Sequence, residues 1–171
     1  MRHRPATEAD VARMHEIEHA SGQAFADVGM PEIADDPEPT AEVIAGYVAA
    51  GRAFVTVDDD DRPVAYAVVD RLDGNVHIEQ VSVDPAAARR GIGARLIDHI
   101  GDWAAARGAP ALTLTTFRDV PWNAPYYARL GFRVLAEDDI GPALTAVRTH
   151  ESRLGPWPRV AMRRDLRATP R

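Results

Sequence analysis

The residues of this chain best suited to bind a charged ligand lie between positions 81 and 96. A β-branched run at 81–83 leads into a turn, and a helical pattern begins where the turn ends. The turn carries two arginines followed by two glycines, namely Arg89, Arg90, Gly91 and Gly93. The first N–H groups of a helix have no partner within it, the helix dipole makes that end positive, and glycine allows close backbone approach. The stretch therefore predicts a site for a phosphate-bearing ligand.

Two well-known phosphate-binding turns do not fit these residues. A P-loop places a lysine after its glycines, and all 20 basic residues of this chain are arginine. The dinucleotide-binding fingerprint needs a third glycine where Leu96 stands, and it opens a chain of alternating strands and helices. An ordinary tight turn is the remaining alternative, and it involves no ligand.

The elements that would position this turn follow from hydrophobic periodicity and from turn residues. Strands are expected at 2–6, 52–57, 63–70, 76–83, 111–117, 132–136 and 159–166. Helices are expected at 8–20, at 40–48, at 91–107 and, as a short helix, from Asn123 onwards. Segment 140–154 is ambiguous and is expected to contain a short helix and a loop. Helix 91–107 makes a crossover between two strands, which are therefore predicted to be parallel neighbours. The expected fold class is α/β, with a mixed, mostly antiparallel sheet of six to seven strands and helices on both faces.

Length and composition limit the class of protein. With 171 residues, of which 46% are hydrophobic, the chain suits a single domain spanning 1–171. It has 0 cysteines, which excludes disulfides, thiolate metal sites and a cysteine nucleophile, and we expect no metal. A net charge of -6 argues against nucleic acid as a partner. No apolar run is long enough to span a membrane and the first residues lack a signal-peptide core, so we expect a cytoplasmic protein without a membrane partner.

Two motifs together resemble the GNAT superfamily of N-acetyltransferases. The glycine turn, Ala88-Arg89-Arg90-Gly91-Ile92-Gly93, is similar to the family's acetyl-CoA pyrophosphate loop, Gln/Arg-x-x-Gly-x-Gly/Ala. Its first position departs from the pattern, because Ala88 replaces a long polar side chain; the backbone N–H groups are unaffected. The second motif, Tyr-x-x-x-Gly-Phe, is present as Tyr127-Ala128-Arg129-Leu130-Gly131-Phe132.

The resemblance implies how acetyl-CoA is bound. It implies a V-shaped splay between the fourth and fifth strands, in which the cosubstrate lies. Backbone groups of Val81 and Val83 would pair with the pantetheine arm, and the N–H of Val81 or Ser82 would polarise the thioester carbonyl. The pyrophosphate would be bound by the backbone N–H groups of six residues, Arg89, Arg90, Gly91, Ile92, Gly93 and Ala94.

The resemblance also implies catalytic roles. Tyr127 takes the position of the general acid that protonates the CoA thiolate. Asn123, four residues earlier, either contacts CoA or caps the helix, and both roles can coexist. Strand alternation places His77 and Glu79 on one face. They fall where related enzymes carry a base that deprotonates the amine, with Glu79 the first choice, His77 the second and water a third possibility.

The function implied is direct acetyl transfer from acetyl-CoA to a primary amine, with a small molecule as the preferred acceptor. An acidic segment at 27–38 is either an ordinary solvated loop, which is the preferred interpretation, or an acidic rim that attracts a cationic acceptor. A protein N-terminus or lysine is the alternative acceptor. A non-catalytic acyl-CoA sensor is the alternative from another class, and a homodimer is a possible assembly.

Overall fold

The computed structural model describes residues 1–30 and 39–167. Most of the acidic segment at 27–38 therefore lies outside the described residues. The strands are β1 (Arg2–Pro5), β2 (Ala53–Val57), β3 (Pro63–Leu72), β4 (Asn75–Val83), β5 (Ala111–Phe117), β6 (Arg133–Val134) and β7 (Arg159–Asp165). The α-helices are α1 (Val11–Gly22), α3 (Ala41–Ala49), α4 (Ile92–Ala105), α5 (Ala124–Arg129) and α6 (Pro142–Glu151). Short 3₁₀ helices are η1 (Glu8–Asp10), η2 (Gln23–Val28), η3 (Pro85–Ala87) and η4 (Glu137–Asp139).

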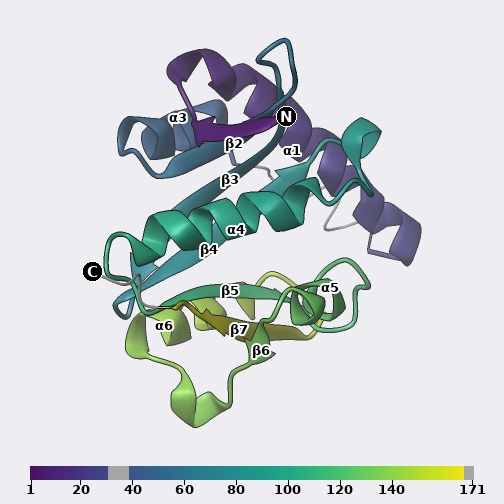
Figure 1. The fold of residues 1–171 in the computed structure, drawn as a ribbon. Coiled ribbons are helices and arrows are strands. Elements are labelled where there is room, and N and C mark those ends of the chain that lie inside the picture. Colours follow the sequence, from purple (N-terminus) through teal and green to yellow (C-terminus); the bar gives the residue numbers. More distant parts are fainter. Residues whose placement is uncertain (31–38, 168–171) are drawn as a thin grey trace. The chain divides into compact units, whose positions relative to one another are not determined.

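Over the described residues, seven strands form one sheet in the order β1-β2-β3-β4-β5-β7-β6 (Figure 1). Strand β4 pairs with β5 in parallel, with Val76 opposite Leu112 and His77 opposite Thr113. The pairs β1–β2, β2–β3, β5–β7 and β6–β7 are antiparallel. The predicted mixed, mostly antiparallel sheet with a parallel crossover is therefore confirmed. The expected splay between β4 and β5 stays a prediction.

The chain divides into two compact units, which are described separately. The first comprises residues 1–69 and 80–100, and the second comprises 70–79 and 101–171. Strands β3 and β4 and helix α4 each contribute residues to both units. The expectation of a single domain stays a prediction.

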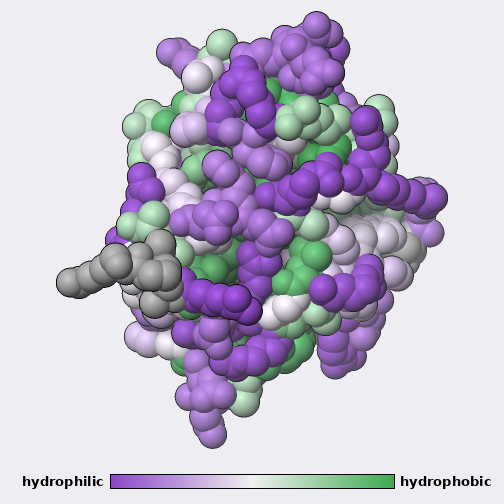
Figure 2. Space-filling model, viewed as in Figure 1, coloured by the Kyte–Doolittle hydropathy of each residue, from purple (hydrophilic) through white to green (hydrophobic). Residues whose placement is uncertain are grey.

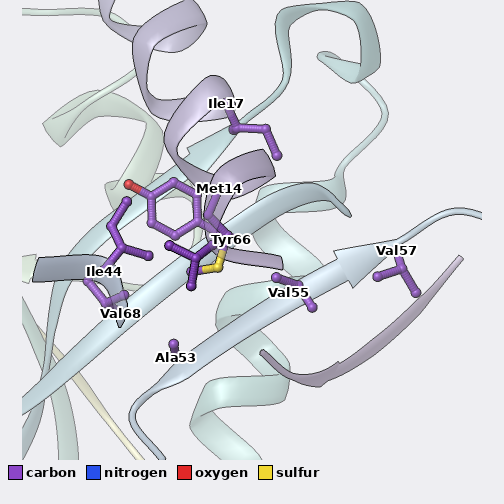
Figure 3. Close-up of a cluster of buried hydrophobic side chains, with 9 residues drawn as sticks. Met14, Ile17, Ile44, Ala53, Val55, Val57, Tyr66 and Val68 are labelled. Carbon is purple, nitrogen blue, oxygen red and sulfur yellow. The ribbon is translucent and has the colours of Figure 1, made fainter. Parts of the chain in front are cut away.

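The core of the first unit is built from helices α1 and α3 and strands β2 and β3 (Figure 3). Met14 and Ile17, three residues apart, lie on the same face of α1 and are fully buried. Burial of each such side chain contributes about 1.5–3 kcal/mol to stability. The other buried members labelled in the figure are Ile44, Ala53, Val55, Val57, Tyr66 and Val68.

In the second unit, β5 pairs with β7 along its whole length, from Ala111 opposite Asp165 to Phe117 opposite Arg159. Helix α6 begins beside the β3–β4 turn, where the Asp73 carboxylate accepts hydrogen bonds from the N–H groups of Ala143 and Leu144, both at 3.0 Å. This cap satisfies two donors that a helix start leaves free. It anchors the start of α6, the helix whose last residue is Glu151.

Some element boundaries differ from the expectation. The first helix is divided into η1 and α1, because the Asp10 carboxylate turns back to accept hydrogen bonds from the N–H and hydroxyl of Thr7. The expected strand 132–136 is reduced to β6, between Gly131 (φ 88°) and the turn of η4. The ambiguous segment 140–154 contains helix α6.

On the face drawn in Figure 2, hydrophilic side chains predominate and hydrophobic residues show only in smaller areas between them. None of the helices in the described part of the chain combines the length and the apolar character needed to cross a membrane.

Candidate active site

The glycine turn lies in the first unit, between β4 and α4. Asp84 is the first residue after β4. Its carboxylate accepts a hydrogen bond from the N–H of Ala86 at 2.9 Å and so caps the start of η3. Arg89 (φ 62°) and Gly91 (φ 68°) both have left-handed backbone conformations, which bend the chain into the start of the helix. The side chains of Arg89 and Arg90 are exposed.

Helix α4 presents free N–H groups at this turn. Its first internal hydrogen bond runs from the N–H of Arg95 to the carbonyl of Gly91 at 3.2 Å. The N–H groups of Ile92, Gly93 and Ala94 come before that bond and have no acceptor within the helix. The Ile92 side chain is buried and anchors the first turn of the helix to the core. The turn can therefore bind an anion through backbone groups.

The last residues of β4, Val81–Val83, also belong to the first unit. The side chains of Val81 and Val83 are half-buried, whereas that of Ser82 is buried on the opposite face of the strand. The Ser82 hydroxyl donates a hydrogen bond to Oε2 of Glu18 at 2.6 Å. This alternation leaves the strand with two different faces, as the sequence predicts.

The two candidate bases lie together in the second unit. Nε2 of His77 is 3.6 Å from Oε2 of Glu79, and Nδ1 of His77 is 3.0 Å from Oγ1 of Thr113. The His77 side chain is 1% exposed, and this burial lowers the pKa of His77 to about 4. Because His77 is neutral at neutral pH, its contact with Glu79 is not an ion pair.

The carboxylate of Glu79 has the opposite shift. Burial, together with the negative charges of Asp70 and Glu151, raises the pKa of Glu79. The side chain is still 45% exposed, so water reaches it and moderates this rise. A carboxylate with a raised pKa is a stronger base than an ordinary one, whereas the lowered pKa makes His77 a weaker base.

Tyr127 and Asn123 lie at the start of α5, in the same unit. Burial raises the pKa of Tyr127 well above its ordinary value, so the phenol is protonated at neutral pH. Its ring makes edge contacts with Tyr126 and Phe132, with centroid distances of 5.4 and 5.8 Å. The ring of Tyr126 therefore packs against that of Tyr127.

The expectation that Asn123 caps the helix is confirmed in position but not in side-chain hydrogen bonding. The residue stands at the N-cap position, but its Oδ1 accepts a hydrogen bond from Oγ1 of Thr116 at 2.8 Å instead. Its Nδ2 is a buried donor without a hydrogen-bond partner among the described residues. A buried donor left unpaired costs stability, and a ligand oxygen at this place would satisfy it.

Sequence reasoning missed three residues around these groups. Thr113 holds the ring of His77, and Glu151 acts on Glu79 through its charge and accepts a hydrogen bond from the hydroxyl of Thr115. The expected parallel pairing of β4 with β5 left the register open, so it did not indicate that Thr113 lies opposite His77. Nothing in the sequence near position 151 indicates its long-range contacts.

The structure thus places the expected residues in two groups. The first unit contains the glycine turn and Val81–Val83; the second contains His77, Glu79, Asn123 and Tyr127. In the described parts, 1–30 and 39–167, no three His, Asp or Glu side chains gather in a way that could hold a metal ion.

Comparison with protein families gives one match. A model of the family described as Acetyltransferase (GNAT) family covers residues 13–132. That range includes β4, the glycine turn, β5 and the Tyr-x-x-x-Gly-Phe motif.

Comparison with solved structures gives neighbours of the same fold. An N-acetylglutamate synthase from Neisseria gonorrhoeae, complexed with coenzyme A and N-acetyl-glutamate, is 18% identical with a TM-score of 0.72; the match covers 97% of this chain and 35% of that one. The PaiA N-acetyltransferase from Thermoplasma acidophilum, in complex with coenzyme A, is 12% identical with a TM-score of 0.70, covering 96% and 98%. The ribosomal-protein-S18-alanine N-acetyltransferase from Escherichia coli is 16% identical with a TM-score of 0.68, covering 99% and 96%. The chain thus spans about a third of the length of the synthase.

Proposed function

Because the chain belongs to the acetyltransferase (GNAT) family, we propose that it transfers the acetyl group of acetyl-CoA directly to the nitrogen of a primary amine. The observation that carries the catalytic part is the pairing of Glu79 with a neutral, buried His77 at 3.6 Å. A binding module has no need of a carboxylate whose pKa is raised in this way.

Acetyl-CoA is the cosubstrate that fits the residues present. The pyrophosphate oxygens accept hydrogen bonds from the N–H groups at the start of α4, and Arg89 and Arg90 add positive charge beside them. The backbone of Val81 and Val83 pairs with the pantetheine arm. Nδ2 of Asn123 is a buried donor without an acceptor among the described residues, and this supports a contact between Asn123 and CoA.

The reaction requires a neutral amine, because an ammonium has no lone pair. An alkyl amine has a pKa near about 10, so Glu79 accepts its proton, directly or through water. The nitrogen then attacks the thioester carbon, and the oxyanion is stabilised by the N–H of Val81 or Ser82. When the C–S bond breaks, the Tyr127 hydroxyl donates its proton to the leaving thiolate. The nitrogen gives up its second proton as the amide forms, and this proton restores the phenol, so that the products are the amide and the free thiol of CoA.

The two possible bases are unequal. The pKa of His77, lowered to about 4, makes this imidazole a poor proton acceptor. Burial and two neighbouring carboxylates raise the pKa of Glu79, which makes it the better one. In this proposal Glu79 is the base, and His77 is the neutral neighbour that fixes its surroundings.

The acceptor is a small cationic amine in this proposal. Asp70 and Glu151 act on Glu79 from within the same unit. Arg159 lies 3.9 Å from Glu151 and offsets part of this negative charge, and the carboxylates that remain attract a positive group. The solved neighbours are named for acetylation of both kinds of acceptor, a small molecule in the synthase and a ribosomal protein in the Escherichia coli enzyme. A protein acceptor is therefore the second candidate.

A thiol-release assay tests this function. The protein is incubated with acetyl-CoA and with a panel of amines that includes a diamine, amino acids, an N-terminal peptide and a lysine peptide. Release of one thiol per acetylated diamine supports the proposal, and release only with peptides favours the protein acceptor. If the protein binds CoA but releases no thiol with any amine of the panel, the acyl-CoA sensor is favoured. Size-exclusion chromatography of the same sample tests the proposed homodimer.

A further inference from the structure

Helix α1 carries a buried carboxylate that the proposed reaction does not use. Both oxygens of Glu18 accept hydrogen bonds, and the donors come from three side chains. Oε2 accepts from the hydroxyl groups of Tyr66 and Ser82, each at 2.6 Å. Nε2 of Gln80 lies 3.0 Å from Oε1 and 3.2 Å from Oε2. These donors are neutral, and hydrogen bonds to a carboxylate are about twice as strong as bonds between neutral groups.

Two of the three donors belong to one short segment of β4. Gln80 and Ser82 lie on the same face of that strand, and Nε2 of Gln80 also lies 3.1 Å from Oγ of Ser82. The residue between them, Val81, faces the other way. Glu18 therefore holds one face of the segment and leaves its backbone and its other face unobstructed by this network.

The same helix holds the end of this segment through a second residue. The Arg13 guanidinium forms an ion pair with the Asp84 carboxylate, and its Nε donates to the carbonyl of Pro63 at 3.2 Å. Asp84 is the residue at which β4 gives way to the glycine turn. Arg13 and Glu18 thus fix the two ends of residues 80–84 from one helix.

We propose that Glu18 is a positioning residue for acetyl-CoA, which holds Gln80 and Ser82 so that the backbone at Val81–Val83 is in place to pair with the pantetheine arm. This inference rests on the proposed function, because it assigns Glu18 to the strand that binds the cosubstrate there. Since a strand that binds a ligand through its backbone must be ordered before binding, loosening the segment lowers affinity. Glu18 acts through the strand and does not touch the ligand.

The experiment measures CoA affinity by calorimetry and thermal stability without ligand. In Glu18→Gln, the charged acceptor is replaced by an amide of the same shape, and the Kd for CoA rises about tenfold, equivalent to about 1.4 kcal/mol. Ser82→Ala removes the tether of the strand and also raises the Kd. The double variant binds no more weakly than Glu18→Gln alone, because both changes break the same contact.

Tyr66→Phe is the matched control. It removes a donor to the same carboxylate, but this donor comes from β3, so it lowers thermal stability and leaves the Kd for CoA within twofold. A Glu18→Gln variant that melts earlier yet binds CoA with unchanged Kd overturns the inference. So does a Tyr66→Phe variant whose Kd rises as much as that of Glu18→Gln, since the network is then only structural. If Glu18→Gln does not fold, an unchanged Kd in Ser82→Ala overturns it. Failure of the unaltered protein to bind CoA overturns the proposed function itself.

Discussion

Nε2 of His77 lies 3.6 Å from Oε2 of Glu79, and the two side chains share one face of β4 because a strand alternates with a period of two. Thr113, the parallel neighbour of His77 on β5, holds the other ring nitrogen at 3.0 Å. The pair is thus fixed by its own strand and by the adjacent one. Burial lowers the pKa of His77 to about 4 and raises that of Glu79.

The first prediction concerns stability in acid. The folded protein keeps His77 neutral down to about pH 4, whereas the unfolded chain binds a proton at its ordinary pKa of 6.5. The unfolded state therefore holds more protons between these values, and stability is full above pH 6.5 and is lost as the pH falls toward 4. At pH 4.5 this group accounts for a loss of about 2–3 kcal/mol.

Urea unfolding at pH 7.5 and pH 4.5 checks this prediction, with His77→Gln as the comparison. Other groups also titrate in this range, so the quantity of interest is the difference between the two proteins. The variant should lose less stability on acidification than the unaltered protein by the amount given above. Equal losses would show that His77 is not kept neutral by burial.

The second prediction concerns Tyr127. Replacement by phenylalanine removes the proton donor and keeps the buried ring, with its contacts to Tyr126 and Phe132. The kcat should fall by about 10- to 100-fold, with little change in the KM for acetyl-CoA, because in the proposed mechanism this hydroxyl acts on the leaving thiolate. Steady-state kinetics measure this change, and Tyr126→Phe is the matched control, expected to retain its activity. A Tyr127→Phe variant of full activity would remove this residue from the mechanism.

The third prediction concerns the glycine turn. Alanine at Gly91 strains a backbone with φ 68° and brings its Cβ within 3.2 Å of the Arg95 side chain. Gly108→Ala is the matched control, because its φ of 76° gives the same strain and its Cβ has nothing within 4 Å. Each variant should lose about 1–2 kcal/mol of stability.

Only Gly91→Ala should also raise the KM for acetyl-CoA, by about tenfold or more, because the proposed function assigns the pyrophosphate to this turn. Chemical denaturation gives the stability of both variants, and initial rates at varied acetyl-CoA give the KM. An equal KM in the two variants would contradict the assignment of the pyrophosphate to the turn.

Features that depend on residues close together in the chain could be predicted from the sequence. The glycine turn and the motif position of Tyr127 could be predicted, because each is defined by residue types within a few positions of one another. The faces of β4 followed from alternation alone. The parallel pairing of β4 with β5 followed from the handed crossover.

The contacts that tune the candidate site were less accessible, because they join distant parts of the chain. The Asn123 side chain does not cap the helix, because its Oδ1 accepts a hydrogen bond from Thr116 on β5 instead. The negative charge of Glu151 raises the pKa of Glu79. Glu151 ends helix α6, whose start is anchored by Asp73, and no pattern in the sequence links these three positions. The sequence places Glu18 in a helix but does not indicate its hydrogen bonds, because its partners on β3 and β4 lie 48 to 64 positions away.

The account depends above all on Glu79 as the base, and its pH dependence gives the most direct test. In the unaltered protein, kcat/KM for the amine should fall as the pH drops through the raised pKa of Glu79, since the protonated carboxyl cannot accept a proton. At pH 7, Glu79→Gln should lower kcat/KM by about 100-fold or more. The defect should shrink as the pH approaches the amine pKa of about 10, where the acceptor loses its proton unaided.

The measurement is thiol release coupled to mass spectrometry of the acetylated amine, from pH 6 to pH 10, for the unaltered protein, Glu79→Gln and an exposed control, Glu137→Gln. The account predicts full activity in the control and a pH-dependent loss in Glu79→Gln, with thermal midpoints that agree. A Glu79→Gln enzyme within about threefold of the unaltered rate at pH 7 would contradict it, because general-base catalysis contributes at least about 100-fold.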